Sequence, residues 1–342
     1  STSSNPTIND TKFVKGGSAG WFSCALTSLA SATTYYVRSY AVNEVGVAYG
    51  AEVTFTTLAI LPTVGASSVS DITSSSATIS SSVVSDGGAT VTERGVVYST
   101  SSNPTISNSK VQSGSGAGGF SCKLSALKYA TTYYARSYAV NEIGIAYGEE
   151  VSFITLASMP IVGASSVSNV TSSSATISGI VTVDGGAAVT ERGVVYSTSS
   201  NPTIDDTKIV NGSGVGTFTC ALTSLSPGTT YYVRSYAVNK VGVAYGEEVS
   251  FKTLAVLPTL STYSASSITS SSATISASVL SDGGAVVIER GVVYSTSSNP
   301  TINDTKFIKD GSTGWFSCAL TSLAYATTYY VRSYAVNEVG VA

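Results

Sequence analysis

The feature that most constrains this chain is an internal repeat of 98 residues. The string TTYY recurs four times, and each step along the chain is 98 residues. Its first tyrosines are Tyr35, Tyr133, Tyr231 and Tyr329, and Cys24, Cys122, Cys220 and Cys318 keep the same spacing. The period holds without an insertion or deletion. It has the length of one small domain, so the sequence predicts a tandem array of near-identical domains.

The 342 residues hold three and a half of these periods. The expected domains are the C-terminal part of a repeat (1–58), two complete repeats (59–156 and 157–254) and a repeat that lacks its last strand (255–342). Both ends of the chain fall inside predicted strands, so we expect the native polypeptide to be longer than 342 residues.

Each period reads as a seven-stranded, all-β sandwich. Pro and Gly/Ser clusters separate short segments of alternating polarity, and no segment keeps a 3.6-residue period. In the third period the expected strands are 161–167, 175–183, 189–197, 207–210, 217–222, 230–238 and 244–253. Asp184, Gly185 and Gly186 predict a tight turn between the second and third strands.

One stretch of each period resembles the fibronectin type III family, whose fold is immunoglobulin-like. Leu225, Pro227, Gly228, Thr229 and Tyr231 match the family's pattern L-x-P-G-T-x-Y. The resemblance implies that Tyr231 and its equivalents Tyr35, Tyr133 and Tyr329 form a tyrosine corner, a hydroxyl hydrogen-bonded to the backbone upstream. Only one of the four corners keeps Pro-Gly, and the others carry alanine at the position of Gly228.

The whole period is also similar to the fibronectin-like repeats of large surface proteins in Bacteroidetes and related bacteria. The strings that carry this likeness are ERGVVYSTSSNPT, TTYYVRSYAVN and YGEEVSFKT. Such repeats occur in stalks, in adhesins and as accessory modules. The likeness therefore implies an extracellular location, at the cell surface or secreted, and leaves the activity open.

Each repeat carries a single cysteine in the pattern F-x-C-x-L. Alternation along a strand places the Phe, Cys and Leu side chains on one face. One thiol per sandwich has no partner within its own domain, so we expect Cys24, Cys122, Cys220 and Cys318 to be buried thiols. Disulfides between chains are the alternative.

The strand that begins at TTYY has a second, outward face. Alternation places a Tyr-Arg-Tyr stripe there in every repeat, which is a candidate binding face for sugars or a neighbouring fibre. Its members are Tyr36, Arg38, Tyr40, Tyr134, Arg136, Tyr138, Tyr232, Arg234, Tyr236, Tyr330, Arg332 and Tyr334. The alternative is purely structural, because tyrosine favours strands and packs across them.

The junctions between repeats are apolar, without a flexible spacer. They read TLAILPTVG, TLASMPIVG and TLAVLPTLS, and we expect their large side chains to be buried against the next repeat, with proline limiting the bend. This expected seam comprises Leu58, Leu61, Pro62, Leu156, Met159, Pro160, Leu254, Leu257 and Pro258. Stiff junctions between sandwiches predict an elongated rod.

Composition excludes several classes of function. The formal net charge is -3 and there is no histidine, so no basic field would gather nucleic acid and the commonest general base and metal ligand is absent. No apolar run approaches the roughly 20 residues of a membrane-spanning helix. No catalytic motif, cofactor site or dedicated metal cage is present, so the sequence does not predict an enzyme.

These observations favour a structural role, as a segment of a bacterial surface fibre or adhesin stalk. The expected partners are neighbouring repeats and, in a fibre, identical chains. A multivalent module that binds carbohydrate or protein, with glycans as partners, and a spacer in a secreted enzyme are the alternatives. Serine clusters could carry O-linked glycans, and Asn9, Asn169, Asn211 and Asn303 fit the N-x-Ser/Thr pattern.

Overall fold

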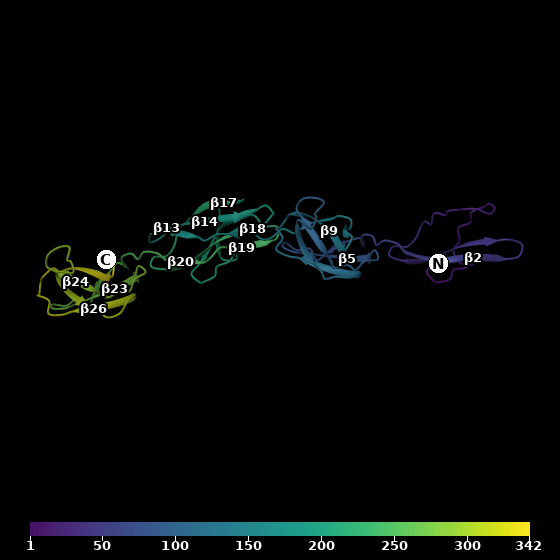
Figure 1. Ribbon diagram of the computed structural model, residues 1–342. Coiled ribbons are helices and arrows are strands. Elements are labelled where there is room, and N and C mark those ends of the chain that lie inside the picture. Colours follow the sequence, from purple (N-terminus) through teal and green to yellow (C-terminus); the bar gives the residue numbers. More distant parts are fainter. The chain divides into compact units, whose positions relative to one another are not determined.

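A computed structural model describes residues 1–342, and its regular elements are all β-strands, with no helix. The chain divides into two compact units, Ser1–Ser158 and Met159–Ala342. Arrows and connecting loops alone make up the ribbon (Figure 1). The all-β fold class expected from alternation along the sequence is therefore confirmed.

In the second unit, residues 159–254 form two antiparallel sheets that face each other. The first contains β12 (Ile161–Val162), β13 (Ser166–Ser168), β14 (Ala175–Val183) and β17 (Gly216–Leu222). The second contains β15 (Glu191–Ser197), β16 (Thr207–Val210), β18 (Thr230–Asn239), β19 (Gly242–Tyr245) and β20 (Val249–Lys252). In chain order, β12 and β13 form strand A, β14 is strand B, β15 is C, β16 is C′, β17 is E, β18 is F, and β19 and β20 form G. The two sheets are therefore A-B-E and C′-C-F-G. This is the strand arrangement of a fibronectin type III sandwich.

Two of the seven expected strands are interrupted in the structure. The ladder of β12 shifts register against β14, so the first strand is split into two short pieces. The last strand is split between β19 and β20, where Gly246 N donates to Ser235 O and Glu248 leaves the ladder. A regular alternation does not reveal such bulges, which shift the register of a strand by local hydrogen bonding.

The remaining residues of the second unit repeat this pattern. One sheet has β21 (Thr259–Leu260), β22 (Ser264–Ser266), β23 (Ala273–Ser281) and β26 (Gly314–Leu320). The other has β24 (Glu289–Ser295), β25 (Thr305–Ile308), β27 (Tyr330–Asn337) and β28 (Gly340–Val341).

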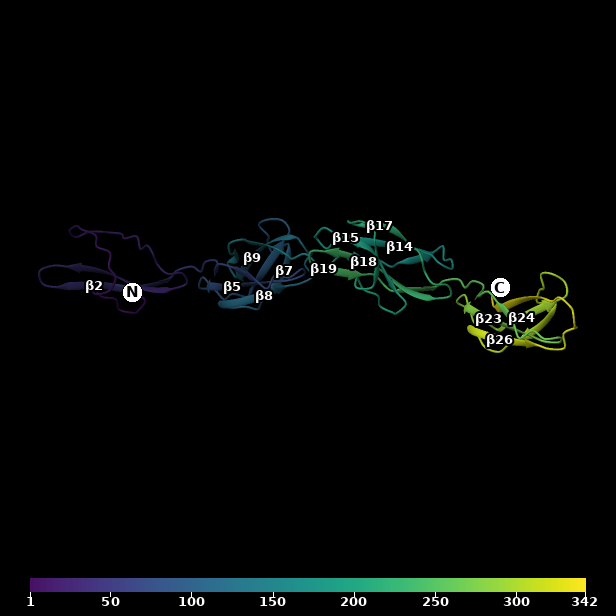
Figure 2. The ribbon, with the colours of Figure 1, turned by 180° about the vertical axis from the view of Figure 1, so that it is seen from behind.

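The first unit contains one more sandwich and one hairpin. The sandwich pairs β3 (Thr63–Val64), β4 (Ser68–Ser70), β5 (Ala77–Ser85) and β8 (Gly118–Leu124) in one sheet. Its other sheet holds β6 (Glu93–Ser99), β7 (Ser109–Gln112), β9 (Thr132–Asn141), β10 (Gly144–Tyr147) and β11 (Val151–Ile154). In Figure 2, β5 and β8 lie in one layer and β9 in the other. In residues 1–58 only β1 (Thr34–Val42) and β2 (Val47–Thr56) pair.

Each sandwich encloses a core drawn from its own residues. In residues 159–254 the fully buried Ile177 and Leu222 of one sheet meet Val194 and Val233 of the other. Equivalent clusters occupy the two other sandwiches. Inward residues alternate along every core strand, as a two-layer fold requires.

The tyrosine corner is present in all four copies. The backbone N–H five residues upstream donates to the hydroxyl of Tyr35, Tyr133, Tyr231 or Tyr329 over 3.0 to 3.1 Å. Alanine takes the place of Gly228 without changing the corner, because Ala32 adopts φ 46° where Gly228 has φ 59°. The corner therefore tolerates alanine in a left-handed conformation that usually favours glycine.

The junctions differ from the expected apolar seam. The leucines that open them are exposed, 86% for Leu58 and 58% for Leu254, and Leu61, Leu156, Met159 and Leu257 are also exposed. Of the nine residues of the expected seam, only Pro62, Pro160 and Pro258 are buried. The expectation that the large apolar side chains would be buried here is therefore wrong.

Backbone contacts at a glycine hold these junctions instead. In the second unit, a Cβ added at Gly284 would lie 2.4 Å from the carbonyl oxygen of Pro227, in the corner of the preceding repeat. In the first unit, a Cβ added at Gly88 would lie 2.1 Å from the Cβ of Ala32. The two main chains approach so closely at these two positions that no side chain fits between them.

Loss of the tyrosine-corner hydroxyl should destabilise one repeat. Tyr231→Phe leaves the Ser226 N–H without its acceptor, and we expect a loss of roughly 1 to 2 kcal/mol. Native-state hydrogen exchange, read by mass spectrometry on peptides of residues 157–254, measures this. Tyr325→Phe is the control, because Tyr325 is 82% exposed. Equal protection in the two variants would show that the corner hydrogen bond contributes nothing.

The junction contact makes a second prediction. Gly284→Ala should speed chymotryptic cleavage at Leu254 and Leu257, because the added Cβ pushes Pro227 away. Gly212→Ala is a matched control: Gly212 has a similar φ of 77°, but nothing lies within 4 Å of an added Cβ. It should cost only the strain of a positive φ, about 1 kcal/mol. Equal cleavage rates in the two variants would rule out a steric role for Gly284.

Candidate functional site

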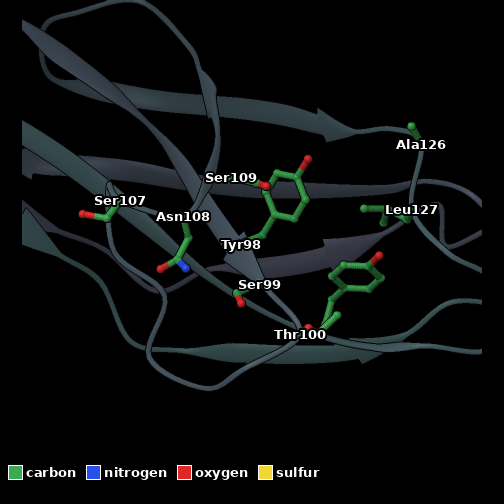
Figure 3. Close-up of a pocket in the computed structure, with 9 residues that line it drawn as sticks. Tyr98, Ser99, Thr100, Ser107, Asn108, Ser109, Ala126 and Leu127 are labelled. Carbon is green, nitrogen blue, oxygen red and sulfur yellow. The ribbon is translucent and has the colours of Figure 1, made fainter.

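A surface groove lies at one end of the sandwich formed by residues 59–158. Its volume is about 640 Å³. Nine residues from four stretches of chain line it: Tyr98, Ser99, Thr100, Ser107, Asn108, Ser109, Ala126, Leu127 and Tyr133. They come from the end of β6, the start of β7, the corner loop and the start of β9, and Figure 3 shows Asn108 and Leu127 on opposite sides of Tyr98.

The base of the groove is built on the tyrosine corner and is rigid. The Tyr133 hydroxyl accepts the Lys128 N–H at 3.0 Å, and its ring lies 5.8 Å from Phe153 and 6.2 Å from Tyr98, centroid to centroid. Tyr133 and Leu127 are buried, while Tyr98 is half-buried. The tyrosine corner thus fixes an aromatic surface at the base of the groove.

The rim of the groove is polar and is also held in place. Asn108 Oδ1 accepts the Thr105 N–H at 2.9 Å, and the Tyr147 hydroxyl accepts the Ile106 N–H at 3.0 Å. The Glu150 carboxylate accepts the Asn103 N–H. The loop between β6 and β7 is therefore tied to β10 and to the bulge that follows it.

The groove contains no formal charge, which distinguishes it from the same place in the other repeats. Residues 107–109 are Ser-Asn-Ser here, Asp-Asp-Thr at 205–207, and Asn-Asp-Thr at 303–305 and 9–11. Ala126 is replaced by serine in all three other copies. The sequence analysis missed this groove, although these differences between otherwise near-identical repeats were a visible signal.

The Tyr-Arg-Tyr stripes lie on the outward face of the second sheet, but only part of each stripe is accessible. Tyr138, Tyr236 and Tyr334 are 0 to 3% exposed. The expectation that they form an open binding face is therefore wrong for these three tyrosines. The strand opposite carries glycine, which leaves room for the ring: a Cβ added at Gly193 would lie 3.1 Å from Tyr236 Cε1.

The arginines of the stripes serve the fold. Arg136 stacks on the Tyr147 ring at 4.7 Å, and its Nε donates to Gly148 O at 3.0 Å. Arg38 and Arg234 make the same contacts with Tyr49 and Tyr245, whereas Arg332 is exposed. The remaining tyrosines of the stripes are called the outer tyrosines below. Of these, Tyr36, Tyr40, Tyr134 and Tyr232 are half-buried, and Tyr330 is 45% exposed.

A Glu-Tyr-Lys cluster covers each of the three buried stripe tyrosines, Tyr138, Tyr236 and Tyr334. Tyr236 donates its hydroxyl proton to Glu191 Oε1 at 2.7 Å, and Lys208 Nζ lies 3.0 Å from the same oxygen. The tyrosine hydrogen bond and the lysine lower the pKa of the Glu191 carboxyl, and burial raises the pKa of the Tyr236 hydroxyl. The same cluster occurs at Glu93 and Glu289.

Three of the four cysteines are buried, as expected. Cys122, Cys220 and Cys318 are 0 to 3% exposed, and burial raises the pKa of each thiol. Cys24 is exposed, contrary to expectation, because no strand forms before Thr34 and residues 1–58 contain no counterpart of β14 for the cysteine segment to pair with. A cavity of about 680 Å³ is lined by Phe22, Cys24 and Tyr35 there, at the positions that form the core of the complete repeats.

Other candidate groups are dispersed. No three His, Cys, Asp or Glu side chains lie together in a way that could hold a metal ion. The structure has no helix with the length and apolarity needed to cross a membrane. Of the four asparagines in N-x-Ser/Thr, Asn9, Asn169 and Asn303 are exposed, while the Asn211 amide donates to Thr219 O at 2.7 Å.

Comparison with known proteins finds likeness among solved structures alone. No family model matches the chain, and no curated protein matches it. Among solved structures it is similar to the FN1–FN3 domains of chicken CNTN1, with 16% sequence identity, 82% of this chain and 94% of that chain covered, and a TM-score of 0.36. The tandem fibronectin type III-like fold rests on the strand order of the chain itself.

The Glu-Tyr-Lys clusters predict a loss of stability in acid. Their glutamates have a lower pKa in the folded chain than in the unfolded chain, so each carboxylate stabilises the fold above the unfolded pKa, about 4.3. This contribution disappears as the pH falls through the folded pKa. Replacing Glu93, Glu191 and Glu289 together with glutamine should lower the melting temperature at pH 7 and flatten its decrease between about pH 5 and pH 3.

Thermal melts monitored by circular dichroism at several pH values test this. Glu142→Gln, which changes an exposed carboxylate in a turn, should leave the profile unchanged. A triple variant whose melting temperature falls as steeply in acid as that of the unmodified chain would contradict the role assigned to the clusters.

Proposed function

We propose that this chain is a segment of an elongated extracellular structural protein, a bacterial surface fibre or adhesin stalk, without catalytic activity. The observation that carries the proposal is that the three sandwiches reuse one set of structural hydrogen bonds. The corner tyrosine, the hydrogen bond from the buried stripe tyrosine to its glutamate, and an asparagine at the end of strand F recur at the same positions. What the repeats share is the framework of the sandwich.

The junctions between repeats also support a mechanical role. Asn337 Nδ2 donates to Val256 O at 2.7 Å and to Asp282 O at 2.9 Å, so one side chain ties the linker to the turn that follows β23. Asn141 makes the same two bonds to Ile60 O and Asp86 O. A linker held by its own repeat and packed against the preceding corner resists bending, as a stalk requires.

Surface chemistry fits an extracellular location. Charged residues are 11% of the chain, and most strand positions that face outward on the A-B-E sheets are Ser or Thr. The three enclosed cysteines are reduced and buried, so these repeats do not depend on disulfides. Fibronectin-like repeats of this kind occur in surface proteins, which is the basis for proposing that the chain lies at the cell surface or is secreted.

Single-molecule force spectroscopy on the full chain tests the stalk. Independent sandwiches should unfold one at a time, each adding a contour length of roughly 330 to 350 Å for a 98-residue repeat, less the folded length. Residues 1–58, which form no closed core, should extend at lower force. A single rupture of the whole chain, or gradual extension without equal steps, would contradict the proposal.

A further inference from the structure

We propose that the groove of residues 98–133 binds one residue of a neutral, pyranose-type sugar. The groove is the one described above, with the ring of Tyr98 between Asn108 and Leu127 (Figure 3) and with Tyr133 also in its lining. This inference does not depend on the stalk, because a groove on one repeat can bind a sugar whatever the mechanical role of the chain.

The groove combines two surfaces that a sugar ring needs. A pyranose has C–H groups on its faces and hydroxyls around its edge. The half-buried ring of Tyr98 is the accessible part of the floor, over the buried Tyr133 and Leu127, and it suits the C–H groups. The hydroxyls of Ser99, Thr100, Ser107 and Ser109 and the amide of Asn108 surround that floor with donors and acceptors. A volume of about 640 Å³ is within the range of small-molecule sites.

The absence of charge in the lining selects a neutral ligand. None of the nine lining residues is ionisable at neutral pH, since a tyrosine hydroxyl ordinarily titrates near 10. An anionic or cationic ligand would lose hydration in the groove without gaining a countercharge. A polyhydroxylated neutral ligand avoids this cost, because each hydroxyl can both donate and accept.

Asn108 supplies the decisive polar group. Its Oδ1 is occupied by the Thr105 N–H at 2.9 Å, which leaves the Nδ2 amide as the donor for a ligand. In the next repeat Asp206 Oδ2 accepts the Thr203 N–H at 2.9 Å, so the turn is the same, but the second oxygen is an anion that cannot donate. The substitution therefore removes a donor without altering the turn that positions it.

The side chains around Asn108 are smaller in this repeat than in the next. Ser107, Ser109 and Ala126 correspond to Asp205, Thr207 and Ser224. Each of these three residues in the next repeat has at least one more heavy atom than its counterpart in the groove. The lining at residues 98–133 thus has smaller and less charged side chains than the equivalent positions of residues 196–231. Its loop is also held before any ligand arrives, which reduces the entropy lost on binding.

The experiment exchanges the two linings within the full chain. The first variant combines Ser107→Asp, Asn108→Asp, Ser109→Thr and Ala126→Ser. Each new side chain already stands at the same position of residues 157–254, so the fold should be retained. The reciprocal variant combines Asp205→Ser, Asp206→Asn, Thr207→Ser and Ser224→Ala. Circular dichroism melts check both for folding.

The probes are the methyl pyranosides of glucose, galactose, mannose and N-acetylglucosamine, with glucuronate as an anionic comparison. Binding is read by saturation-transfer difference NMR, which detects weak ligands on the intact chain. At least one neutral glycoside should receive saturation from the unmodified chain and glucuronate none. The first variant should bind about tenfold more weakly, the effect of losing a donor and leaving a sugar hydroxyl unpaired. The reciprocal variant should give a stronger signal than the unmodified chain.

Three results would overturn the proposal. The first is no saturation transfer to any of the four neutral glycosides. The second is transfer that survives the first variant undiminished, which would place binding elsewhere, such as on the outer tyrosines. The third is preferential transfer to glucuronate, which would show that the uncharged lining does not select the ligand.

Discussion

Strand F of each sandwich is fixed at both ends by hydrogen bonds between a side chain and the main chain, and the rest of the repeat depends on this. At its start, the hydroxyl of Tyr133 accepts the Lys128 N–H and sets the corner. At its end, Asn141 donates to Ile60 O and Asp86 O and accepts from the turn that follows. Between these points β9 pairs with β6, β10 and β11. One strand therefore positions the groove at its start and the linker that precedes its repeat at its end.

The sequence alone was sufficient for the framework of the fold. The 98-residue period, the alternation within it and the corner pattern predicted seven strands in two sheets and the role of Tyr231. These features are local or strictly periodic, so they are visible without coordinates. The buried thiols followed from the same alternation, except at Cys24, because the segment before Thr34 has no partner strand and does not form a strand itself.

What the sequence did not reveal depends on contacts between distant backbone segments. Leu58 and Leu254 looked like seam residues because they are large and apolar, yet the junction closes through Gly88 and Gly284, whose lack of a side chain lets two main chains meet. Tyr236 looked accessible because alternation turns it outward, yet Gly193 on the paired strand leaves space that its ring fills. In both cases the steric consequence of a glycine lies on another segment of the chain, which the local sequence pattern does not show.

Differences between the repeats separate structural positions from positions free to specialise. The corner tyrosines, the asparagines at the end of strand F and the Glu-Tyr pairs are identical wherever the structure uses them. The rim positions of the groove vary, and they do so without loss of the turn, since Asn108 and Asp206 accept the same backbone N–H. A position whose structural duty is met by either residue can change its remaining polar atom at little cost to stability. A repetitive framework of this kind can therefore carry a different surface chemistry on each repeat while every repeat keeps the same fold.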